Sequence, residues 1–260
     1  MNAAVTLALV GGTGLTELDE NVKSISLDTP YGAPSAPIRE VQSGPVRLLF
    51  LPRHGNPHRF PPHCVNYQAN IWALREVGAD HVLAVSAVGG VCEPYGPATL
   101  AVPDQLIDYT WGRNHTFCDS EHVELEHVDF TRPYEGPLRR TLLKAARDAS
   151  IEVVDGGCIG VFQGPRLESS AEVEKARRDG CHMAGMTSLP EAGLARELGL
   201  DYAGLAVVSN WGAGVTGEPL SEDDIAETLR EPMMSVRALV RALLKRMQDQ
   251  GTAGQEGEND

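Results

Sequence analysis

Short runs of apolar residues alternate along the chain with segments whose apolar residues recur at helical spacing. The apolar runs are continuous, which is typical of strands covered on both faces of a sheet. The predicted strands cover residues 5–10, 46–51, 81–88, 105–110, 152–162 and 202–210. The predicted helices cover residues 66–76, 137–149, 171–179, 189–198 and 223–247.

This alternation of strands and helices predicts an α/β fold with a mixed, mostly parallel central sheet flanked by helices. No repeat or linker divides the chain, so residues 1–247 are predicted to form one catalytic domain. Residues 248–260 are polar and contain glycine, and are predicted to be a disordered tail. Residues 114–134 lack a clean period and are predicted to form a long surface loop.

Two residue patterns predict how individual helices begin and end. Ser188 and Glu191 have the spacing of a capping box, with a proline inside the first turn. A weaker, acidic version of this pattern begins at Ser221. Pro232 is predicted to interrupt the last helix near Glu231, because proline cannot continue a helical hydrogen-bond ladder.

Composition and charge narrow the classes of partner. Of the 260 residues, 22 are Lys or Arg and 36 are Asp or Glu, so the formal net charge is −14. An acidic chain argues against binding to nucleic acid or to an anionic membrane, both of which need a basic face. A local pocket for an anion is still compatible with this balance.

Cysteine usage and the first residues predict the compartment. The five cysteines are odd in number and none has CxxC spacing, which argues against a disulfide framework or a cysteine-rich zinc site. The N-terminal apolar run has no basic region before it and enters a glycine turn, so it is predicted to be a strand and not a signal peptide. With no apolar stretch long enough to cross a membrane, the chain is predicted to be cytoplasmic.

The first candidate ligand site is the glycine turn Val10–Leu15, at the end of the first predicted strand. Such a turn exposes backbone N–H groups to an anion, and Thr13 adds a hydroxyl donor. A dinucleotide fingerprint would need a further glycine where Glu17 stands. A tight turn that binds nothing explains the same glycines equally well.

A second candidate follows the next predicted strand, where Arg53 offers a fork that suits phosphate. His54 and His58 are four residues apart, but nearby prolines deny them a helix, so a helical metal pair is excluded. A solvated loop arginine is the alternative for Arg53.

Two more strand ends carry small or hydroxyl residues. Ser86 and Ala87 lie in a run of small residues that leaves room for a ligand, or for a neighbouring helix to pack. Thr187 precedes a predicted helix N-terminus, where an anion is favoured by the helix dipole. Ser188 is better explained as a helix cap. Spacing alone does not join these four strand ends into one site.

Five motifs together resemble the methylthioadenosine phosphorylase branch of the trimeric purine nucleoside phosphorylases. They are GGTGL, RHG-x-x-H, VNYQANIWAL, QGPR and MTSLPE, and the resemblance runs from Val5 to Leu229. It implies a single α/β domain, a homotrimer, no metal or other cofactor, and inorganic phosphate as co-substrate. The implied reaction cleaves a purine nucleoside into the free base and a ribose 1-phosphate.

The resemblance also implies roles for individual residues. Met186 matches a methionine that lies against the ribose, and His58 matches a histidine near the 5′ side of the sugar. Leu167 stands where adenine-specific relatives stack a phenylalanine over the base. The implied phosphate ligands are Thr13, Arg53, His54, Ser86, Ala87 and Thr187.

One departure from the adenine-specific pattern changes the expected base. Where those relatives have Asp-x-Asp, this chain has Asn210-Trp211-Gly212. A protonated leaving adenine presents two donors, N7–H and the 6-amino group, which suit a carboxylate. Protonated hypoxanthine presents a donor at N7 and an acceptor at O6, which match the C=O and NH₂ of an amide. A flipped asparagine could read ground-state adenine, but without helping the transition state.

The sequence therefore predicts phosphorolysis of a 6-oxopurine nucleoside, with Arg53 and His54 holding phosphate and Asn210 stabilising the departing base. S-methyl-5′-thioinosine is the first candidate substrate. Inosine or guanosine, methylthioadenosine, and a nucleotide-binding module without catalysis are the alternatives. The choice between methylthioinosine and inosine or guanosine depends on the pocket for the 5′ group. Ile225 and Leu229 could form an apolar wall there, and Glu222 lies nearby in the sequence.

Overall fold

The structure is a computed structural model that describes residues 5–11, 23–118, 125–217 and 222–256, with backbone alone at 222–224 and 251–256. Its strands are β1 (Thr6–Gly11), β2 (Lys23–Ile25), β3 (Ile38–Ser43), β4 (Val46–Pro52), β5 (His81–Gly90), β6 (Leu100–Val102), β7 (Gln105–Asp108), β8 (Val154–Asp155), β9 (Cys158–Val161), β10 (Met183–Gly185) and β11 (Asp201–Trp211). Its helices are the 3₁₀ turn η1 (Pro62–Cys64), α1 (Tyr67–Glu76), α2 (Pro137–Asp148), α3 (Ser170–Arg178), α4 (Ser188–Glu197), α5 (Glu222–Thr228) and α6 (Arg230–Glu256).

The strands form one mixed sheet of eleven strands. Its main path runs in the order β2-β3-β4-β1-β5-β10-β9-β7, while β11 pairs with β5 and β6, and β6 pairs with β8. The pairs β1–β4, β1–β5 and β5–β11 are parallel, whereas β3–β4 and β5–β10 are antiparallel. The predicted fold class, an α/β fold with a mixed and mostly parallel central sheet, is confirmed.

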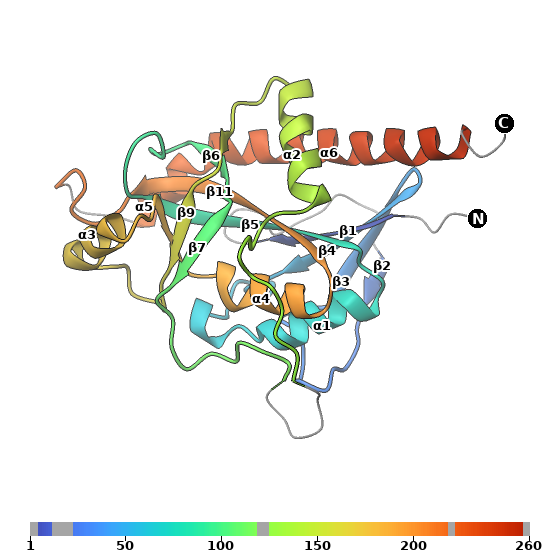
Figure 1. Cartoon of the computed structure of the whole chain (residues 1–260), viewed down its shortest axis with the longest axis horizontal. Helices are drawn as coiled ribbons and strands as arrows, with labels where there is room; N and C mark the ends of the chain where they lie inside the picture. The colour runs from blue at the N-terminus through green and yellow to red at the C-terminus, as the bar shows by residue number, and fades with distance from the viewer. Residues whose placement is uncertain (1–4, 12–22, 119–124, 218–221, 257–260) are drawn as a thin grey trace.

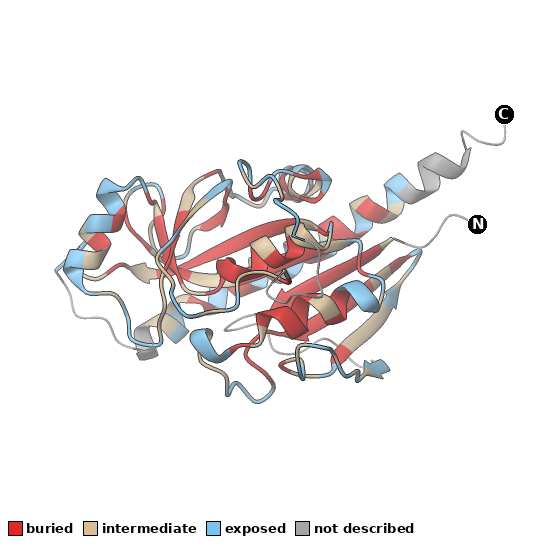
Figure 2. Ribbon diagram, turned by 60° about the horizontal axis from the view of Figure 1, so that its bottom comes forward, coloured by how far each residue is buried: buried red, intermediate tan, exposed pale blue. Residues whose placement is uncertain are grey.

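Helices cover both faces of this sheet, so its central strands are buried throughout. Along β1, Leu7 and Leu9 face a core built with α2 and α6, while Ala8 and Val10 face a core built with α1 and α4. Figure 1 shows these two pairs of helices on opposite sides of the sheet. The strands between them are almost wholly buried (Figure 2). Burial of these strands on both faces of the sheet therefore explains their continuous apolar runs, as the sequence predicts.

Strand prediction failed mainly where strands are short or interrupted. The segment predicted as one strand over residues 152–162 forms β8 and β9, separated by Gly156 and Gly157. Both glycines have positive φ, which breaks the extended backbone. The short strands β6 and β10 and the partly exposed strands β2 and β3 were not predicted, because none carries a long apolar run.

The last predicted helix is two helices. The break falls at Leu229, and Pro232 lies in the first turn of α6, where its missing N–H costs no helical hydrogen bond. Helix α6 continues past Met247 to Glu256, although the polar composition there predicts a tail. Gln248 donates a hydrogen bond of 2.7 Å to the carbonyl of Ser43, which ties this part of α6 to the sheet. Residues 257–260 lie outside the described residues.

The parallel strands β1, β4, β5 and β11 end at one edge of the sheet. Arg53 follows β4, Ser86 and Ala87 lie in the second half of β5, and Asn210 lies near the end of β11. Thr187 lies between β10 and α4. Ligands of open α/β sheets bind at this edge. Among the helices of the described residues, none is long and apolar enough to span a membrane.

Candidate active site

A pocket of about 220 Å³ opens at this edge. Ten of the residues predicted from the sequence line it together: Arg53, His54, His58, Ser86, Ala87, Leu167, Met186, Thr187, Asn210 and Gly212. The tertiary fold therefore joins the strand ends that spacing alone could not. Thr13, the remaining predicted ligand, lies outside the described residues, as does Ser221.

Two hydroxyl groups meet at one end of the pocket. Ser86 Oγ on β5 lies 3.1 Å from Thr187 Oγ1, which precedes α4. Thr187 is the N-cap residue of α4, yet its side chain makes no capping hydrogen bond. Its hydroxyl is thus directed to Ser86 and the pocket instead of to the helix backbone.

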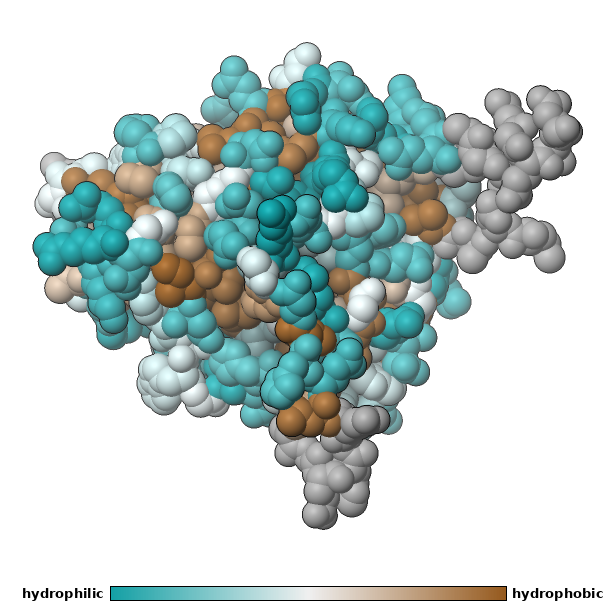
Figure 3. All heavy atoms as spheres, viewed as in Figure 1, coloured by the Kyte–Doolittle hydropathy of each residue, from teal (hydrophilic) through white to brown (hydrophobic). Residues whose placement is uncertain are grey.

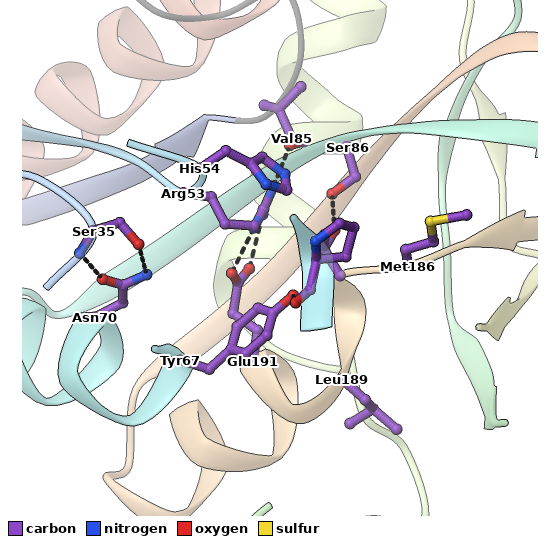
Figure 4. A network of polar contacts seen from close by, with 12 residues as sticks. Ser35, Arg53, His54, Tyr67, Asn70, Val85, Ser86, Met186, Leu189 and Glu191 are labelled. Carbon is purple, nitrogen blue, oxygen red and sulfur yellow. Dashed lines mark hydrogen bonds and ion pairs between the residues drawn. The ribbon is translucent and has the colours of Figure 1, made fainter. Parts of the chain in front are cut away.

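The capping box predicted from Ser188 and Glu191 does not form. Leu189 has φ −120° and ψ 141°, so the first turn is not helical there, and Glu191 points into the core. Its carboxylate accepts hydrogen bonds from Arg53 Nε at 2.7 Å and Nη2 at 2.9 Å. Figure 4 shows this ion pair with Ser86 close by. A capping box is present instead at α3, between Ser169 and Glu172.

His54 is a neutral imidazole with a fixed hydrogen bond. Its Nδ1 lies 2.7 Å from the carbonyl of Phe60, which can only accept, so Nδ1 carries the proton. Burial, assisted by the positive charge of Arg53, lowers the pKa of His54 to about 4. Nε2 is then a hydrogen-bond acceptor. The ring stacks on His58 with centroids 4.4 Å apart.

The opposite part of the pocket carries an amide. Asn210 Nδ2 donates to the carbonyl of Trp211 at 2.7 Å, and Oδ1 accepts from Ser209 Oγ at 2.7 Å. One N–H and one lone pair of the amide remain for a ligand. Gly212 does not have a positive φ, so its backbone conformation does not itself require glycine. Space is the limit: a Cβ there would lie 3.1 Å from Val173 Cγ1 and 3.2 Å from the carbonyl oxygen of Gly90.

Glu168 is a pocket residue that the sequence interpretation missed. It lines the cavity with Asn210, and its Oε1 atom is buried without a hydrogen-bond partner. Burial raises the pKa of this carboxyl group, and the neighbouring Glu172 adds to the rise. A buried acceptor without a partner is costly. The signal available in the sequence was its place one residue after Leu167 in the base segment.

Arg113 is a second missed residue, and it fixes the loops on two sides of the pocket. Nη1 donates to the carbonyls of Met186 and Leu189 at 2.8 and 2.6 Å. Nη2 donates to the carbonyls of Phe162 and Gln163 at 3.1 and 2.9 Å. The guanidinium thereby holds the segment before Leu167 against the segment that carries Thr187. Nothing in the loop sequence distinguishes this arginine from a solvated one.

Two apolar side chains, Pro62 and Ile225, line the pocket together with His58. Leu229 does not line the pocket and is buried in the core with α6. The side chain of Glu222 lies outside the described residues.

Metal ligands do not gather within the described part of the chain: no three side chains of His, Cys, Asp or Glu are placed to hold a metal ion there. Among the described residues, Cys64, Cys92, Cys158 and Cys181 form no disulfide. The chemistry that the pocket offers is therefore hydroxyl, guanidinium, imidazole, amide and carboxylate hydrogen bonding.

The pocket combines anion donors at one end with an amide and a carboxylate at the other. Residues 6–245 of the chain match the model of the phosphorylase superfamily. The chain belongs to this family. It is 53% identical over 214 residues to a Xanthomonas campestris pv. campestris protein named "Probable S-methyl-5′-thioinosine phosphorylase", covering 81% of this chain and 85% of that protein.

Two further relatives extend the comparison. The 6-oxopurine nucleoside phosphorylase of Pyrococcus furiosus is 38% identical over 244 residues, covering 92% of this chain and 91% of that one. The methylthioadenosine phosphorylase of Schistosoma mansoni, in a structure with adenine, superposes with a TM-score of 0.87 at 31% identity. That superposition covers 95% of this chain and 96% of the other.

Proposed function

We propose that this enzyme cleaves a 6-oxopurine nucleoside with inorganic phosphate, and that its substrate is S-methyl-5′-thioinosine. The products are hypoxanthine and 5-methylthioribose 1-phosphate. The names of the Xanthomonas and Pyrococcus relatives support the base class. Within the structure, one observation carries the proposal. Asn210 lines the same pocket as Glu168, whose carboxylate oxygen Oε1 is buried without a hydrogen-bond partner.

This pair matches hypoxanthine at three positions. Glu168 accepts from N1–H, the Asn210 amide donates to O6, and its oxygen accepts from N7–H as the base departs. Adenine reverses two of these groups, because its N1 is an acceptor and its 6-amino group is a donor. A site built to hydrogen-bond one pattern rejects the other strongly, since mismatched buried groups stay unpaired.

Phosphate is held at the other end of the pocket by Ser86, Thr187 and Arg53. It lies below C1′ of the sugar, where its negative charge stabilises the oxocarbenium-like state that forms as the glycosidic bond loosens. Nε2 of the neutral His54 accepts a hydrogen bond from a protonated oxygen of the phosphate. Phosphate then attacks C1′ directly as the bond from C1′ to N9 of the base breaks. The phosphate gives up its proton and the departing base gains one at N7, so the step balances without a covalent enzyme intermediate, a metal or an organic cofactor.

The lining around the 5′ position favours a methylthio group over a hydroxyl group. Pro62 and Ile225 supply apolar surface in the pocket that His58 also lines. Burying a methylthio group against such surface is favourable, whereas a 5′-hydroxyl there would lose hydrogen bonds to water.

We also propose that the enzyme is a cytoplasmic homotrimer. Trp111 is 72% exposed and Leu125 is 67% exposed. Leu125 lies in the irregular segment 114–134 and Trp111 shortly before it, and a neighbouring subunit can cover exposed apolar side chains of this kind. Figure 3 shows apolar surface distributed among polar side chains on one face. His127 is exposed in the same segment and could reach a partner's site. An odd number of cysteines, none of them at CxxC spacing, suits a reducing compartment. A fully active monomer in light scattering at assay concentration would refute the trimer.

The deciding experiment incubates the enzyme with methylthioinosine, methylthioadenosine and inosine, each with and without phosphate. The base is expected to be released only when phosphate is present, and fastest from methylthioinosine. Faster cleavage of inosine would assign the 5′ pocket to a hydroxyl group. Efficient cleavage of methylthioadenosine would contradict the base assignment, and no phosphate-dependent release from any of the three would contradict the phosphorylase assignment.

A further inference from the structure

Glu191 is a completely buried carboxylate that no step of the proposed reaction uses. It lies near the start of α4, only four residues after Thr187, and its relative exposure is 0%. Three donors satisfy it: Arg53 Nε at 2.7 Å, Arg53 Nη2 at 2.9 Å, and the hydroxyl of Tyr202 at 2.9 Å. A charge held this deeply needs its partners, because an unpaired buried carboxylate is strongly unfavourable.

The pairing changes what Arg53 can offer a ligand. Glu191 takes the fork of the guanidinium, and Nη1 donates to the carbonyl of Val85 at 3.0 Å. One N–H on each Nη nitrogen remains for the pocket. Burial by itself lowers the pKa of Arg53, but the Glu191 carboxylate more than reverses this, so the pKa is raised and the guanidinium stays charged. The pair as a whole is neutral.

The same contacts connect the two segments that carry the phosphate hydroxyls. Val85, which accepts from Arg53, is followed on β5 by Ser86. Ser86 Oγ lies 3.1 Å from Thr187 Oγ1, and Thr187 leads back to Glu191 along the chain. Figure 4 shows Arg53 between Val85 and Glu191, with Ser86 nearby. The ion pair thus fixes Arg53 and the start of α4 relative to β5.

We propose that Glu191 is a positioning residue for the phosphate co-substrate. It holds the guanidinium of Arg53 so that the remaining N–H groups face the pocket, and it fixes Thr187 opposite Ser86. This role rests on the proposed phosphorolysis, since it assigns the anion end of the pocket to phosphate. A residue that merely stabilises the fold would alter phosphate and nucleoside binding alike, whereas Glu191 acts on phosphate.

The test compares Glu191→Gln, which removes the charge at nearly constant size, with Tyr202→Phe. The latter removes the third hydrogen bond to the carboxylate and leaves both Arg53 contacts in place. Measured quantities are the KM for each substrate, the melting temperature, and the affinity for inorganic phosphate alone by titration calorimetry. Glu191→Asp, which keeps the charge but shortens the side chain, is the second variant in case Glu191→Gln does not fold.

Glu191→Gln is expected to raise the KM and Kd for phosphate at least tenfold and to change the nucleoside KM less than threefold. Glu191→Asp is expected to give a smaller rise in the same constants. Tyr202→Phe is expected to lower the melting temperature with phosphate affinity within threefold of wild type. Unchanged phosphate affinity in the glutamate variants, or an equal loss for both substrates, would overturn the role of Glu191.

The wild-type enzyme tests the reaction separately. If it binds phosphate but releases no base, the proposed function fails, while the calorimetric comparison still decides the role of Glu191.

Discussion

The hydroxyl groups of Ser86 and Thr187 lie 3.1 Å apart although 101 residues separate them in the chain. Both line the pocket, and Thr187 is buried. In the absence of a ligand each satisfies the other, and a bound phosphate can accept from both. Their contributions to phosphate binding should therefore be coupled.

Ser86→Ala and Thr187→Val test this coupling. Each is expected to weaken phosphate binding by about 1.5–3 kcal/mol, the usual value of a hydrogen bond to a charged group. The double variant should lose less than the sum, because either single change already disrupts the pair. Titration of the four proteins with inorganic phosphate measures the coupling, and strict additivity would show that the two hydroxyls bind independently.

Base preference should depend on Asn210. Asn210→Asp places a carboxylate against O6 of the oxopurine. It is expected to lower kcat/KM for methylthioinosine, by an amount equivalent to about 2–3 kcal/mol of lost transition-state stabilisation. The wild-type enzyme should prefer methylthioinosine to methylthioadenosine. Steady-state kinetics on both substrates check this, and a wild-type enzyme that cleaves methylthioadenosine efficiently would refute the amide argument.

Adding a second carboxylate at position 212 requires more room. A Cβ on Gly212 would approach Val173 Cγ1 to 3.1 Å, so Gly212→Asp is expected to lower the melting temperature. Val173→Ala should relieve part of this crowding, while the contact of 3.2 Å with the carbonyl oxygen of Gly90 remains. The combination of Asn210→Asp, Gly212→Asp and Val173→Ala is expected to shift the kcat/KM ratio toward methylthioadenosine further than the same protein with Val173 retained. An equal ratio in the two proteins would exclude Val173 as the obstacle.

Glu168 should set the requirement for N1–H of the base. Glu168→Gln still can accept but no longer carries charge, and kcat/KM for methylthioinosine is expected to fall by about tenfold to a hundredfold. Because burial raises the pKa of Glu168, the wild-type enzyme should lose this acceptor at a higher pH than an ordinary carboxyl group would. The acidic limb of the kcat/KM profile should therefore be missing in Glu168→Gln. A limb that persists unchanged would assign it to another group.

His54 should make folding stability depend on pH. Its pKa is lowered to about 4 by burial and Arg53, from 6.5 in an unfolded chain. Between these values the unfolded chain binds a proton that the folded protein does not, so this stability is complete above pH 6.5 and is lost as the pH falls toward 4. The full effect is about 3 kcal/mol.

Urea unfolding at pH 7 and at pH 5 measures this dependence. His54→Gln should show a smaller loss of stability on acidification than wild type, and His63→Gln, at an exposed position on η1, serves as the matched control. An identical pH dependence in wild type and His54→Gln would remove His54 as its source.

Much of the fold follows from patterns local in the sequence. The continuous apolar runs placed β1, β4, β5 and β11 correctly, because a strand buried on both faces has few polar positions. Donors at the ends of such strands identified Arg53 and Ser86 as ligand candidates, since parallel strands end at one edge. The resemblance in five motifs supplied the base and phosphate assignments that local pattern could not.

Only the tertiary structure decided which groups those side chains face. The spacing of Ser188 and Glu191 predicts a local cap, but Glu191 is directed to Arg53, 138 residues earlier in the chain, because a buried charge takes the partner that the fold supplies. Glu168 and Arg113 stand in loops without periodicity, so neither the burial of Glu168 nor the hydrogen bonds of Arg113 could be read from a local pattern. Hydrophobic periodicity records which face of an element is buried, whereas pairing between distant polar groups depends on distances that exist only once the chain is folded.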